Sequence, residues 1–132
     1  MSDANKNSKE YKGSIFKLTP IDEDEVRKEI RALLVRDEYI AAAFRTVRDQ
    51  LVFTNKRIIS ADIMGVTGAR KTYTIMPYAR ILFFSIQTPG LTELIRDSEL
   101  ILTFANNSVI TYQIEGGRNI YGIGQVISDY IL

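Results

Sequence analysis

The sequence predicts a mainly β domain, in which seven short strands form a bent antiparallel sheet or partly open barrel and a C-terminal α-helix caps it. Apolar residues alternate over short segments, and turn residues separate these segments. Strands joined by short turns favour an antiparallel meander. At the C-terminus the period changes, because Ile120, Ile123, Ile127 and Ile131 recur at helical spacing. A sheet with one apolar face needs a cover, and this last helix can supply it.

The predicted strands are short and follow one another closely. They cover residues 38–47, 50–54, 57–63, 71–76, 81–88, 98–104 and 109–114. The sheet therefore spans about 38–114, and the C-terminal helix about 119–132. Gly122 and Gly124 lower the helix propensity of that segment, but they allow close packing on the sheet.

An additional helix is predicted over residues 22–35, where Val26, Ile30 and Leu34 form an apolar face. Asp22 and Glu25 have the spacing of a capping box. The acidic run that contains them could bind a cation, but helix capping explains it better. Residues 1–14 are polar and indicate a flexible tail, which leaves 15–132 as a single domain.

Composition excludes several classes of site. The chain has 132 residues with a net charge of +1, so no overall charge attracts it to nucleic acid. It contains no cysteine and no histidine, which removes disulfides, thiolate zinc sites and the common nucleophile–base pairs. We expect no catalytic residue, no metal site and no cofactor. The polar N-terminus lacks the apolar core of a secretory signal, and no apolar run is long enough for a membrane span, so we expect a cytoplasmic protein.

Two basic segments are candidates for binding an anion. Lys56 and Arg57 lie in the polar TNKR segment between two apolar strands, and Arg70 and Lys71 follow the glycine-containing loop GVTG. Backbone amides of a turn beside basic side chains can hold a phosphate. The flanking strands favour a simple hairpin turn at TNKR, and the second segment lacks the spacing of a phosphate-binding loop.

The segment ILFF is apolar on both faces of its predicted strand. Simple alternation places Ile81 and Phe83 on one face and Leu82 and Phe84 on the other. A small antiparallel domain has one core, so the second apolar face needs another cover. That cover is either the N-terminal helix or a second copy of the chain. The candidate residues for an oligomer interface are Ile59, Ile81 and Phe83.

An ordered set of motifs resembles the bacterial pleckstrin-homology-like (PH-like) domain family. It consists of LVFTNKRII at 51–59, GVTG at 65–68 and IMPYARI at 75–81, followed by SELILTF and a closing helix that ends in ISDYIL. The resemblance covers roughly residues 20–132. It implies a PH-like seven-stranded sheet with a C-terminal helix, no enzymatic activity, and ring-shaped homo-oligomers, which some members form. The phosphoinositide site of eukaryotic relatives is not implied, since its long basic loop corresponds here to only Arg48-Asp49.

Together these observations predict a non-enzymatic, self-associating interaction module of unknown cellular role. Its expected partners are copies of itself or an unidentified protein, with no nucleic acid and no transmembrane segment. The alternative is a binder of anionic lipid headgroups or phosphate ligands that uses Lys56, Arg57, Arg70 and Lys71.

Overall fold

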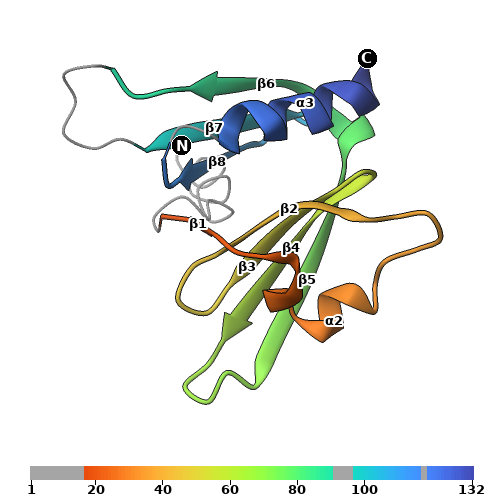
Figure 1. Ribbon diagram of the computed structural model, residues 1–132, viewed down its shortest axis with the longest axis vertical. Helices are drawn as coiled ribbons and strands as arrows, with labels where there is room; N and C mark the ends of the chain where they lie inside the picture. The colour runs from red at the N-terminus through yellow and green to blue at the C-terminus, as the bar shows by residue number, and fades with distance from the viewer. Residues whose placement is uncertain (1–16, 91–96, 117–118) are drawn as a thin grey trace.

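Two antiparallel sheets make up most of the computed structural model, which describes residues 17–90, 97–116 and 119–132 (Figure 1). The first sheet has the strand order β1-β2-β3-β4-β5, and the second has the order β6-β7-β8. The bounds are β1 Thr19–Pro20, β2 Ile40–Arg45, β3 Gln50–Thr54, β4 Arg57–Met64, β5 Arg70–Pro77, β6 Ile81–Gln87, β7 Ser98–Phe104 and β8 Val109–Ile114.

The predicted fold class is confirmed, since each of the seven predicted strands has its counterpart among β2 to β8 and the C-terminal helix α3 spans Asn119–Ile131. The TNKR segment is a hairpin turn between β3 and β4, in which Phe53 pairs with Ile58. The Thr54 hydroxyl oxygen accepts hydrogen bonds from the backbone N–H groups of Lys56 and Arg57, both at 3.0 Å. This local bonding explains why the polar segment sits between two buried strands.

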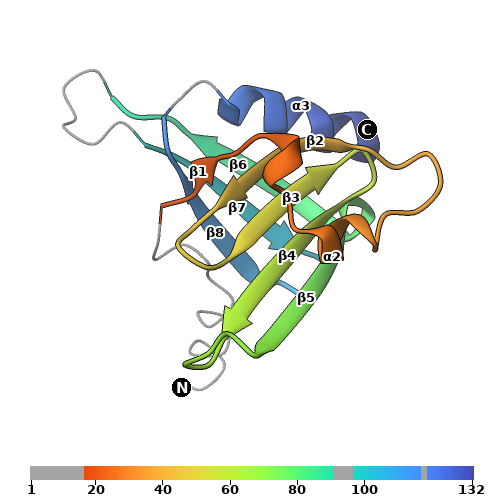
Figure 2. The same ribbon diagram turned by 60° about the horizontal axis from the view of Figure 1, so that its bottom comes forward.

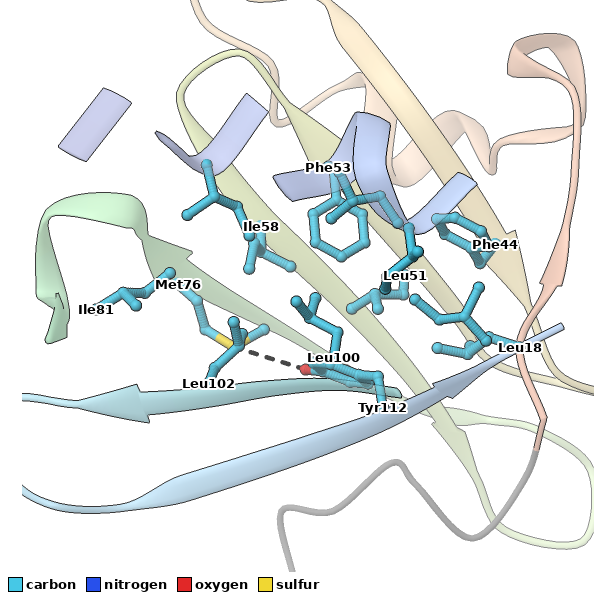
Figure 3. Close-up of a cluster of buried hydrophobic side chains, with 14 of the residues drawn as sticks. Leu18, Phe44, Leu51, Phe53, Ile58, Met76, Ile81, Leu100, Leu102 and Tyr112 are labelled. Atoms are coloured by element: carbon cyan, nitrogen blue, oxygen red, sulfur yellow. Dashed lines mark hydrogen bonds between the residues drawn. The ribbon is translucent and has the colours of Figure 1, made fainter. Parts of the chain in front are cut away.

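The main core lies between the two sheets (Figure 3). Phe44 and Phe53 meet edge to face with ring centroids 5.9 Å apart. Helix α3 contacts both sheets and covers this core with three buried isoleucines, Ile120, Ile123 and Ile127.

The segment before the first long strand ties the two sheets together. The Leu18 backbone N–H donates to Gln113 O at 2.9 Å, which forms a parallel bridge to β8. The next two residues form β1, where Thr19 pairs with Arg45 of β2. Strand β5 is an edge strand of the first sheet and β6 is an edge strand of the second. The 3-10 turn Tyr78–Arg80 connects them. Strand β1 was not predicted, because two residues that include a proline carry no strand pattern.

The predicted N-terminal helix over 22–35 is wrong in its continuity. The segment forms a 3-10 turn at Glu23–Glu25 and a short helix, α2, at Lys28–Arg31. Val26 and Arg27 between them have non-helical backbone, with ψ of 135° and 141°. The Gln50 side chain of β3 explains the break, since its Oε1 accepts from the Arg27 N–H at 2.9 Å and its Nε2 donates to Glu25 O at 3.1 Å. The hydrogen bonds to the Gln50 side chain thus take the place of backbone hydrogen bonds that a continuous helix would make.

This broken segment nevertheless covers the outer face of the first sheet, as Figure 2 shows for α2 over β4. Val26 and Ile30 are buried against Val52, Ile59 and their neighbours in a second, smaller core. Two covers were considered for the second apolar face, the N-terminal segment and a second copy of the chain. Over β3 and β4 this cover is the N-terminal segment.

The face assignment within ILFF is wrong, because β6 contains a β-bulge. The register with β7 shifts between Ile81, which pairs with Phe104, and Phe83, which pairs with Thr103. The extra residue changes the side-chain alternation. Ile81 is consequently buried in the main core, and Phe84 packs partly against the same core. Leu82 and Phe83 are both exposed.

Candidate interaction surfaces

Arg57 is bonded within the chain at one end of the first sheet. Its Nε lies 2.9 Å from Glu38 Oε2 and its Nη2 lies 3.0 Å from Glu38 Oε1, while Nη2 also donates to Leu33 O at 2.6 Å. The Glu38 side chain is fully buried, and it also accepts from the Thr54 hydroxyl at 2.6 Å. The Nε and Nη2 donors of Arg57 are thus committed to partners within the chain.

The buried groups near this pair have shifted pKa values. Burial by itself raises the pKa of Glu38, but the hydrogen bonds from Arg57, Thr54 and the Val35 N–H outweigh it, so the net pKa is lowered. Burial raises the pKa of the Tyr78 phenol far above its usual value, and the Glu38 carboxylate adds to this. The neutral Tyr78 hydroxyl donates to Thr54 O at 2.7 Å. The turn is therefore held by a connected set of charged and neutral hydrogen bonds.

The four predicted anion-binding residues do not lie together. In the β4–β5 hairpin Arg57 pairs with Pro77 at one end and Met64 pairs with Arg70 at the other. Seven residues of extended strand separate the two ends by roughly 20 Å. Lys56 and Arg57 are therefore remote from Arg70 and Lys71. Lys71 also lies 3.7 Å from Glu29 in a half-exposed ion pair.

Only one of the three predicted interface residues is on the surface. Ile59 is fully buried in the second core and Ile81 is buried in the main core, whereas Phe83 is 56% exposed. Leu82, which was not among the candidates, is 59% exposed. Sequence alternation missed Leu82 because the bulge that turns it outward leaves no local signal in the sequence.

Strand β6 is an edge strand of unusual composition. It pairs with β7 on one side, and among the residues that the structure describes no strand pairs with its other side. Edge strands are commonly protected from association by charges or proline. The edge strand β5 follows this rule with Arg70, Lys71 and Pro77, whereas β6 has the sequence ILFFSIQ without a charge or a proline. The edge of β6, with Leu82 and Phe83, is thus an apolar surface suited to pairing.

Acidic side chains gather at two places within the described ranges. Asp22, Asp24 and Glu25 place carboxylate oxygens within 4.8 Å of one another, but all three are exposed. Asp62 is partly buried. Burial raises the pKa of its carboxyl group, and the nearby Asp49 carboxylate raises it further.

Solved structures share this two-sheet architecture. A DUF1696 family protein with a pleckstrin-homology domain from Shewanella loihica PV-4 matches with a TM-score of 0.74 and 31% identity, over 89% of this chain and 99% of that one. A pleckstrin homology domain from Shewanella amazonensis SB2B matches with a TM-score of 0.61 and 32% identity, over 85% and 90% of the two chains. The fold therefore defines a PH-like domain.

The chain belongs to the bacterial PH domain family, whose model matches residues 11–131. Two proteins of Bacillus subtilis strain 168 are similar to it, and both are uncharacterised. YjqA is 33% identical over 103 residues, which cover 78% of this chain and 82% of YjqA. YozO is 39% identical over 64 residues, which cover 48% of this chain and 55% of YozO. The family resemblance drawn from the sequence motifs is thus confirmed.

A membrane-spanning helix is not found in the described ranges 17–90, 97–116 and 119–132, since none of their helices is both long and apolar enough.

Proposed function

We propose that this PH-like domain is a non-enzymatic module that associates with copies of itself through the free edge of β6. The observation that carries the proposal is the pair of exposed apolar side chains, Leu82 and Phe83, on an edge strand without charges. An antiparallel pair of β6 strands related by a two-fold axis would satisfy the unpaired backbone groups of both copies.

The second sheet adds apolar surface next to this edge. Phe83 pairs with Thr103 of β7, and Thr103 pairs with Val109 of β8, so the three residues lie in one row across the sheet. Phe83 and Val109 are both exposed. Burial of this row together with the strand edge would give a second copy both directional hydrogen bonds and apolar contact.

The experiment is light scattering behind a gel-filtration column at several protein concentrations, with wild type, Phe83→Lys and Tyr39→Lys. Tyr39 is a matched control, because it is an exposed aromatic residue that directly precedes β2 of the other sheet. We expect the wild type to elute at a multiple of 15.0 kDa, Phe83→Lys to shift toward 15.0 kDa, and Tyr39→Lys to behave as the wild type. A wild type that stays at 15.0 kDa at every concentration would contradict the proposal.

Contact with an anionic surface is the second candidate function. It is favoured by Arg70 and Lys71, which are exposed at the end of β5 and far from the Arg57–Glu38 pair. This candidate site contains Arg70 and Lys71 but not Lys56 and Arg57, so it differs from the four-residue patch predicted from the sequence.

A further inference from the structure

Two loops at one end of the first sheet are joined by Arg48. The β2–β3 turn is closed by the Thr46 N–H, which donates to Asp49 O at 2.9 Å. In the β4–β5 hairpin, Gly65 and Gly68 have positive φ values of 87° and 71°. Arg48 Nη2 donates to Gly65 O at 2.7 Å, and a Cβ on Gly68 would lie only 3.2 Å from the same nitrogen. The guanidinium group therefore lies against the neighbouring hairpin and keeps the two loops together.

Each of these loops carries a valine that points into solvent. Val47 is 93% exposed and Val66 is fully exposed, while Met64 at the base of the hairpin is half exposed. Valine is neither a typical turn residue nor a residue that gains from complete hydration. Figure 1 shows the β4–β5 hairpin extending beyond the rest of its sheet, so its tip is accessible to a large flat partner.

Basic side chains lie on the strands and loops that carry the two valines. Arg45, Arg48, Arg70 and Lys71 are exposed at this end of the sheet, and Lys71 is also 3.7 Å from Glu29 in a half-exposed ion pair. The nearby Asp49 has its Oδ1 occupied by the Ile63 N–H at 2.8 Å and is partly buried. In a chain whose net charge is only +1, this end is thus locally basic. We name the surface formed by residues 45–48 and 64–71 the valine tip.

We propose that the valine tip inserts Val47 and Val66 into the surface of an anionic lipid bilayer, while Arg45, Arg70 and Lys71 contact lipid phosphates. Two convex loops with apolar ends and a basic rim complement a bilayer, in which apolar chains lie beneath negative headgroups. A site for one particular headgroup would need convergent free donors, but Arg48 is already bonded to Gly65. The inference rests on the second candidate function and is independent of self-association through β6.

The experiment is sedimentation of the full chain with vesicles at low salt. One set is phosphatidylcholine alone and the other contains about one-third phosphatidylserine. We expect binding to the second set and weaker binding as salt rises. Val47→Ser/Val66→Ser should lower the affinity about tenfold through lost apolar insertion, and Arg70→Glu about fivefold or more through charge reversal.

Lys56→Glu is the matched charge control, since Lys56 lies at the opposite end of the same hairpin region and its backbone, rather than its side chain, makes the turn bond. Its affinity should stay within about twofold of the wild type. If the wild type binds and Val47→Ser/Val66→Ser binds equally well, insertion is refuted while anionic contact stands. If the wild type does not bind at low salt, or if Lys56→Glu loses as much affinity as Arg70→Glu, the valine tip is not a membrane site. Thermal unfolding of each variant confirms that its fold is retained.

Discussion

Arg57 and Glu38 form a two-pronged ion pair between the β3–β4 turn and the segment that precedes β2, with N–O distances of 2.9 and 3.0 Å. The Glu38 carboxylate is fully buried, and Arg57 also donates to Leu33 O. These bonds therefore connect the segment between α2 and β2 to the start of β4 in the first sheet. Removal of one partner would leave the other charge buried without compensation.

Glu38→Ala is expected to destabilise the fold by about 3 kcal/mol, because Arg57 and the Thr54 hydroxyl lose their shared acceptor. Urea unfolding followed by circular dichroism measures the change. Glu29→Ala is the control, since its ion pair with Lys71 is half exposed and its removal should lower the stability far less. Equal losses in the two variants would show that the buried pair has no special role.

Two carboxylates make opposite contributions to the pH dependence of stability. The pKa of Glu38 is lowered in the folded state, so its contribution is present above its unfolded pKa and is lost as pH falls through the folded pKa. The pKa of Asp62 is raised by burial and then by Asp49, so its contribution is greatest below its unfolded pKa and is lost as pH rises through the raised pKa.

Asp62→Asn is therefore expected to increase the free energy of unfolding at neutral pH and to leave it nearly unchanged in strong acid. Denaturant unfolding at a series of pH values measures this difference. The prediction fails if the substitution lowers stability at neutral pH to the same extent as in acid.

Two glycines of α3 should respond in opposite ways to alanine. A Cβ on Gly124 would lie 2.7 Å from Ile86 Cδ1 of β6, whereas a Cβ on Gly122 meets nothing within 4 Å. Gly122→Ala should raise the unfolding free energy by up to about 1 kcal/mol through helix propensity. Gly124→Ala should lower it by about 1 kcal/mol, because Ile86 must move. Thermal unfolding of the two variants gives the comparison, and a stabilised Gly124→Ala would show that the contact is easily relieved.

Burial predicts separate effects for the three residues first considered for an interface. Ile59→Ala and Ile81→Ala should each lower the free energy of unfolding by about 3 kcal/mol, since they leave cavities in the two cores. Phe83→Ser should change the stability of the isolated chain by about 0.5 kcal/mol or less, because its side chain is largely exposed. Unfolding measured at low protein concentration separates these effects from association. A large loss for Phe83→Ser under those conditions would mean that it packs within the chain.

The strands and the C-terminal helix could be predicted because their signals are local. Alternation around Leu100 and Leu102, or helical spacing of Ile120, Ile123 and Ile127, is complete within one element. Turn chemistry is equally local, so the TNKR hairpin was recognised from Thr54 and Asn55 together with the flanking apolar residues.

Contacts between distant segments decided the rest. Gln50 bonds the backbone around Arg27 and breaks the predicted helix, although the apolar spacing of that segment is helical. The bulge in β6 buries Ile81 and exposes Leu82, and it is defined by the register against β7. The sequence by itself determined strands β2 to β8 and helix α3, since propensity and periodicity act over a few residues. Tertiary structure alone decided which faces are covered, which edge stays free and which charges are paired, because each of these depends on residues far apart in the chain.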